Sequence, residues 1–91
     1  MIQVRPISDD QFEVVVREGN GETRHHVSMM RKTYVQLTGG KETPERCIEA
    51  AFRFLLDRES KGSILPRFDV TVISRYFPEF ERELPRYLAQ R

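Results

Sequence analysis

The spacing of apolar residues along the chain changes near Ser28. Before this position apolar and polar residues alternate, and Phe12, Val14 and Val16 share one face of the alternating segment. After it, apolar residues recur at helical spacing, most clearly over residues 47–55. The order predicts an α+β fold, in which an N-terminal antiparallel meander of three strands packs against three to four C-terminal helices.

The alternating half predicts a hairpin preceded by one more strand. Residues 2–7 and 11–18 are the first two strands, and the Asn-Gly pair at 20–21 is a strong signal for a two-residue type I′ turn. That turn would place Val16 opposite His25 and Val14 opposite Val27, so that one face of the sheet is apolar.

The second half predicts a short helix and a longer one. Ser28 is a candidate N-cap for a first helix that ends at the Gly-Gly pair at 39–40. Thr43 followed by Pro44 predicts the start of a second helix, which should run to about Glu59.

The remaining third of the chain is less regular. Residues 60–67 form a connector in which Ile64 and Leu65 are expected to be buried. Residues 68–77 fit either a β-branched strand or a helix capped by Asp69, and the helix is favoured. A last helix should begin at Pro78 and be kinked or ended by Pro85.

Size and charge exclude several classes of protein. The 91 residues suit one domain, and a net charge of +1 argues against a dedicated nucleic-acid-binding protein. The N-terminal residues carry no secretory signal, and no apolar run approaches the ~20 residues that cross a bilayer. We therefore expect a cytoplasmic protein with no membrane partner.

Few residues of the chain could take part in catalysis or bind a metal ion. His25 and His26 are neighbours on a strand, point to opposite faces and cannot bind one metal ion together. The single cysteine, Cys47, is on the apolar side of its helix and is expected to fill the core. No phosphate-binding glycine loop and no nucleophile–base pair can be placed. The expectation is a protein without enzymatic activity, metal or cofactor.

Aromatic and arginine residues near the C-terminus form the first candidate interaction surface. Such residues are enriched where proteins bind one another, although the rings could instead complete the core. An open edge of the sheet is a second place for a protein partner or a homodimer contact. The candidate surface consists of Arg75, Tyr76, Phe80, Arg82, Arg86 and Tyr87.

An alternative hypothesis is nucleic-acid binding through a local positive patch. Arg24, His26, Arg31 and Lys32 would form it where the third strand meets the first helix.

One segment also resembles other proteins. Its motifs are Tyr34-x-x-Leu37-Thr38-Gly39-Gly40, Thr43-Pro44-Glu45, Phe52-x-Phe54-Leu55-Leu56-x-Arg58-Glu59, Ser63-Ile64-Leu65, Phe68-Asp69 and Tyr76-Phe77-Pro78. Together they resemble small bacterial proteins of unassigned function. The resemblance implies no active site, ligand or partner.

Overall fold

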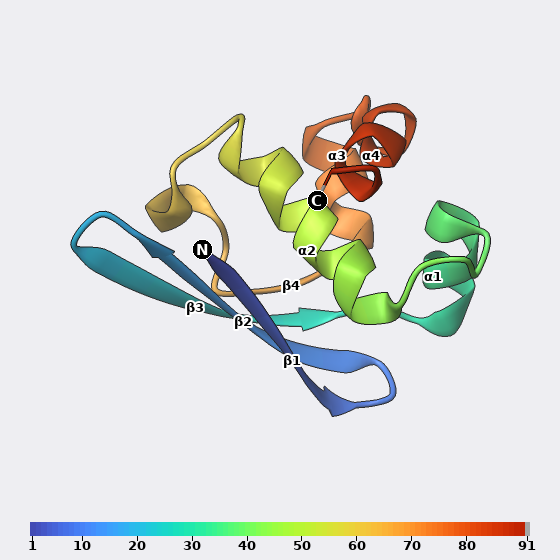
Figure 1. Ribbon diagram of the computed structural model, residues 1–91, viewed down its shortest axis with the longest axis horizontal. Helices are drawn as coiled ribbons and strands as arrows, with labels where there is room; N and C mark the ends of the chain where they lie inside the picture. The colour runs from blue at the N-terminus through green and yellow to red at the C-terminus, as the bar shows by residue number, and fades with distance from the viewer. Residues whose placement is uncertain (91) are drawn as a thin grey trace.

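The computed structural model describes residues 1–90 and contains one four-stranded sheet with its helices on one face (Figure 1). The strands lie in the order β1-β2-β3-β4; the first three are antiparallel, and β4 is parallel to β3. The elements in chain order are β1 (Ile2–Ser8), β2 (Gln11–Glu18), β3 (Gly21–Ser28), α1 (Arg31–Thr38), α2 (Pro44–Leu56), the 3-10 turn η1 (Lys61–Ser63), β4 (Arg67–Asp69), α3 (Thr71–Tyr76) and α4 (Phe80–Leu88). The predicted α+β class, with a meander followed by helices, is confirmed; the fourth strand was not predicted.

The hairpin between β2 and β3 turns one residue earlier than the sequence suggests. Its central residues are Gly19 and Asn20, and only Gly19 has a positive φ, of 57°. A type I′ turn over residues 20–21 needs positive φ at both positions, whereas glycine at the first central position suits a type II′ turn. Val14 therefore pairs with His25, two residues from the predicted partner. Because the side-chain period of a strand is two, the predicted apolar face is kept.

The ambiguous segment 68–77 is a strand and then a helix. Phe68 pairs with Val27 in β4, and the chain turns at once into α3. Asp69 joins the two elements, since its carboxylate accepts the Thr71 N–H at 3.0 Å and the Ser28 hydroxyl at 2.5 Å. Burial raises the pKa of Asp69, but these hydrogen bonds outweigh it and hold the pKa below its ordinary value.

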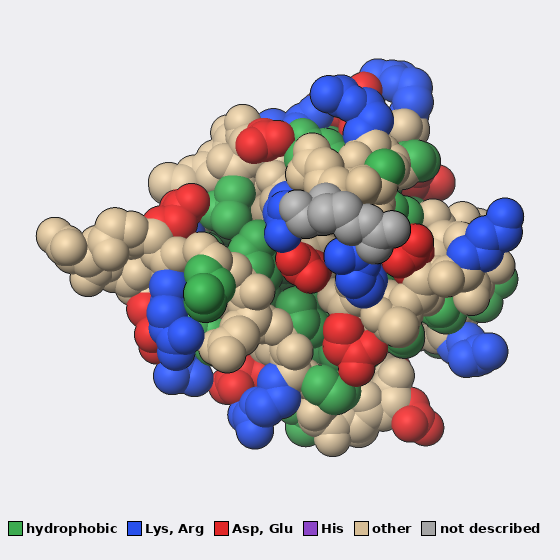
Figure 2. Space-filling model, viewed as in Figure 1, with side chains coloured by type: hydrophobic (Ala, Val, Ile, Leu, Met, Phe, Trp, Pro, Cys, Tyr) green, Lys and Arg blue, Asp and Glu red, His purple; other side chains and the backbone are tan. Residues whose placement is uncertain are grey.

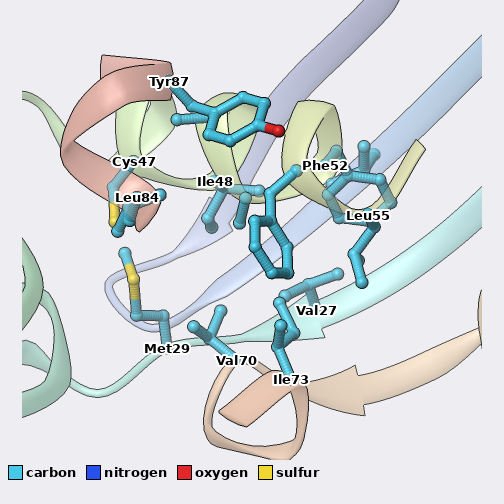
Figure 3. Close-up of a cluster of buried hydrophobic side chains, with 14 of the residues drawn as sticks. Val27, Met29, Cys47, Ile48, Phe52, Leu55, Val70, Ile73, Leu84 and Tyr87 are labelled. Carbon is cyan, nitrogen blue, oxygen red and sulfur yellow. The ribbon is translucent and has the colours of Figure 1, made fainter. Parts of the chain in front are cut away.

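The helix α2 is buried on two sides and organises the core (Figure 3). Ile48, Phe52 and Leu55 point toward β3 and α3, whereas Cys47 lies beside Leu84 of α4. The apolar stripe predicted from the sequence omits Ala50 and Phe54, which are also buried. The opposite side of α2 is buried because α4 packs on it, which places α2 between the sheet and α4.

Two of the four predicted helix-end signals act as the sequence suggests, and two do not. Thr43 caps α2 by accepting the Arg46 N–H at 3.1 Å, and Gly39 ends α1 in the left-handed conformation, as predicted. Ser28 does not cap α1, because its hydroxyl is bound to Asp69. Pro85 does not end α4, which continues through it to Leu88. Within residues 1–90, no helix has the length and apolar character needed to cross a bilayer.

Candidate functional site

The structure divides the predicted C-terminal surface into buried and exposed residues. Phe80 is 1% exposed and Tyr87 is 7% exposed, so neither can serve as an anchor for a partner. Both pack edge-on against Phe54 of α2, with ring centroids 5.0 and 5.8 Å away. Their inclusion in an interaction surface was wrong, since α2 supplies a second apolar side that these rings cover.

A polar cluster beside these rings holds α4 against α2. The Tyr87 hydroxyl donates to Asp57 at 2.5 Å, and the Arg58 guanidinium lies 3.7 Å above the Phe54 ring. Arg58 also pairs with Glu79 at 3.1 Å. The backbone N–H of Glu79 and the Arg58 charge together lower the pKa of the Glu79 carboxyl. We assign this cluster a structural role, because each of its members joins two parts of the helical layer.

The other predicted surface residues are exposed but differ in their pairing. Arg82 and Arg86 both pair with Glu83, at 3.9 and 2.6 Å. Tyr76 is 68% exposed, and Arg75 beside it makes no ion pair within residues 1–90. Only the α3 part of the predicted surface therefore offers unengaged side chains.

The predicted nucleic-acid patch is split between two elements. Arg24 lies on the face of β3 that no helix covers, where it pairs with Glu13 at 3.7 Å and with Glu22 at 3.1 Å. The side chain of His26 is within hydrogen-bond distance of Gln11, at 2.5 Å.

The other two members of the patch, Arg31 and Lys32, are exposed in the first turn of α1. Figure 2 shows acidic and basic side chains interspersed on the visible face of the molecule, with neither sign collected in one area.

An apolar groove lies beside β4, and we call it the edge groove. Its volume is about 440 Å³. Two of its side chains are unusually exposed for their type, Leu65 at 45% and Tyr76 at 68%. Leu65 was expected to be buried, and that prediction was wrong. The groove is lined by Leu55, Glu59, Ser63, Leu65, Phe68, Ile73, Tyr76 and Phe77.

The edge groove exists because the sheet stops at β4. The His26 N–H donates to the Pro66 carbonyl at 2.8 Å, and the Val70 N–H donates to the Ser28 carbonyl at 2.9 Å. In an extended strand alternate residues turn their backbone groups to opposite sides, so those of Arg67 and Asp69 point away from β3. A further strand would pair there, and its side chains on the helical face would lie in the groove.

A buried histidine fixes one wall of the groove. His25 is 3% exposed; its Nδ1 lies 2.8 Å from the Leu65 carbonyl and its Nε2 lies 2.9 Å from the Thr23 hydroxyl. The ring also packs at 5.3 Å from Phe52. Both ring nitrogens have hydrogen-bond partners, as a buried polar side chain requires. Sequence spacing gives no sign of this role, since Leu65 is 40 residues from His25.

The residues with potential for catalysis are not assembled near the groove. Burial raises the pKa of the Cys47 thiol to about 12, so the thiol is protonated at neutral pH. Among residues 1–90, no group of three or more His, Cys, Asp or Glu side chains could hold a metal ion. The groove itself contains one carboxylate, Glu59, and one hydroxyl, Ser63, among apolar side chains. Its chemistry suits the binding of apolar side chains.

Comparisons with protein-family models, with curated proteins and with solved structures found no match to this chain.

Proposed function

We propose that this chain is a non-catalytic interaction module of the cytoplasm that binds a protein through the edge groove. The observation that carries the proposal is the coincidence of two features: an apolar groove of about 440 Å³ and unpaired strand edge groups at Arg67 and Asp69. An open edge supplies backbone hydrogen bonds to an added strand, and a groove beside it receives alternate side chains. The protonated Cys47 thiol supports the non-catalytic part of the proposal.

The charged residues around the groove support a protein partner over a nucleic acid. Among the described residues, the lining of the groove contains one charged side chain, Glu59, and no arginine or lysine, whereas a nucleic-acid site needs several cations that follow a phosphate backbone. Arg24, which the nucleic-acid alternative requires, is already balanced by Glu13 and Glu22. That alternative rests on Arg31 and Lys32 alone.

The test is site-specific photocrosslinking in native cell extract. A photoreactive phenylalanine derivative replaces Tyr76, whose exposure makes the change tolerable, and the matched control carries it at Gln36 on the exposed side of α1. The proposal expects discrete protein adducts from position 76 that are absent from position 36. Equal labelling at both positions, or adducts with nucleic acid only, would contradict it.

A further inference from the structure

We propose, on the basis of this proposed function, that the partner of the β4 edge is the β4 of a second copy. The two strands pair antiparallel about a two-fold axis, with Phe68 facing Phe68 of the other copy. The two sheets then form one continuous sheet of eight strands. Backbone geometry, charge and the nature of the opposite edge each point to this arrangement.

The backbone groups of β4 match this register. Arg67 and Asp69 turn their N–H and C=O groups toward the open edge, and within residues 1–90 no hydrogen bond engages these groups. Centring the pair on Phe68 brings Arg67 opposite Asp69 of the second copy. In an antiparallel pair, two opposed residues whose backbone groups point toward each other form two N–H···O=C hydrogen bonds. The two symmetry-related pairs therefore use all four donors and acceptors of each edge.

The charges select the same register. Arg67 is exposed and makes no ion pair within the described part of the chain, and the low pKa of Asp69 keeps its carboxylate charged at neutral pH. The proposed pairing sets these opposite charges side by side twice, on the face of the sheet that no helix covers. If the two-fold axis passed one residue away from Phe68, Arg67 would face Arg67 or Asp69 would face Asp69 of the second copy, and like charges directly opposite each other are unfavourable.

The other edge of the sheet is poorly suited to pairing. β1 contains Pro6, which has no N–H to donate, and its register with β2 is interrupted between Pro6 and Ser8. Pairing of β4 with β1 of another copy would also leave an edge free at each end and produce an open chain of molecules. A two-fold contact between β4 strands closes at the dimer and covers the exposed Leu65 and Tyr76.

The decisive test is a charge exchange between two variants. Arg67→Asp would oppose Asp to Asp in its own dimer, and Asp69→Arg would oppose Arg to Arg. A mixture of the two variants would form a heterodimer in which both pairs are again opposite in charge. We expect sedimentation equilibrium to show a dimer for the wild type, at least tenfold weaker association for each variant alone, and restored association for the mixture.

A second measurement covers the case in which Asp69→Arg unfolds, since Asp69 also binds Ser28 and Thr71. Phe68→Cys would form an intermolecular disulfide under mild oxidation, because residues facing each other across the axis approach closely. Gln36→Cys, at an exposed position on α1, is the matched control. A wild type that stays monomeric at the highest attainable concentration, or that dimerises unaffected by Arg67→Asp, would overturn the inference. If such a monomer still crosslinks a different protein at position 76, the proposed function stands and the self-pairing fails.

Discussion

Two aromatic residues of the C-terminal third should respond oppositely to truncation, although the sequence places them in one candidate surface. Phe80 is 1% exposed and lies 5.0 Å from Phe54, whereas Tyr76 is 68% exposed. Removal of a buried phenylalanine side chain costs about 3–5 kcal/mol, because apolar burial is lost and a cavity remains. A surface substitution usually stays within about 0.5 kcal/mol.

These magnitudes are large relative to the stability of a chain of this length. A domain of 91 residues has a free energy of unfolding of about 5–14 kcal/mol. Phe80→Ala should therefore remove a substantial part of it and lower the melting temperature by roughly 12 °C or more. Tyr76→Ala should melt within a few degrees of the wild type and lose only the crosslinked or self-paired partner.

The assay is urea unfolding followed by far-UV circular dichroism, with Phe80→Leu as a control that keeps a large apolar side chain. Phe80→Leu should be less destabilised than Phe80→Ala, since it leaves a smaller cavity. Comparable losses for Phe80→Ala and Tyr76→Ala would refute the division of this region into core and surface. A stable Phe80→Ala variant with impaired binding would show that Phe80 belongs to the interaction surface and not to the core.

Three further predictions concern local chemistry. Iodoacetamide should label Cys47 only as fast as the protein unfolds, because the buried thiol has a pKa of about 12; rapid labelling of the native protein would contradict this. The lowered pKa of Asp69 adds stability that is present above its ordinary value of 3.8 and is lost as pH falls through the folded value. Asp69→Asn should therefore flatten the decline in stability measured by acid titration, and an unchanged decline would count against these hydrogen bonds. Thr43→Ala should cost about 1 kcal/mol in urea unfolding by removing the N-cap of α2, whereas Thr43→Ser should retain most of the stability.

The parts of the fold that depend on local signals could be predicted from the sequence. The alternation around Val14 gives the strand and its buried face, and Thr43-Pro44 gives the start of α2. The hairpin register was wrong by two residues because glycines stand on both sides of Asn20, and either dipeptide can make a tight turn. Its buried face was nevertheless right, since a shift of two residues does not change sides.

The parts that depend on distant contacts could not be predicted. β4 has only three residues and is defined by its pairing with β3, about 40 residues earlier in the chain. Its alternation merges with the helical pattern of α3, so periodicity alone cannot separate them. The burial of Phe80 and Tyr87 likewise depends on the second apolar side of α2. The edge groove depends on the β3-β4 pairing. The sequence alone does not show that the exposed Leu65 lines a groove, because the other lining residues are distant in the chain.

The late position of β4 in the chain has a consequence for the order in which the molecule folds. The meander β1-β2-β3 closes through short turns, but the β3-β4 pair requires closure of a loop that contains α1 and α2. Loops of that length close at a greater entropic cost, and contacts far apart in sequence form late. We expect the amide of Phe68 to exchange hydrogen sooner than that of Val14. A nascent or partly unfolded chain would then contain the hairpin before the groove has formed, so the proposed partner binding would occur only after folding is complete.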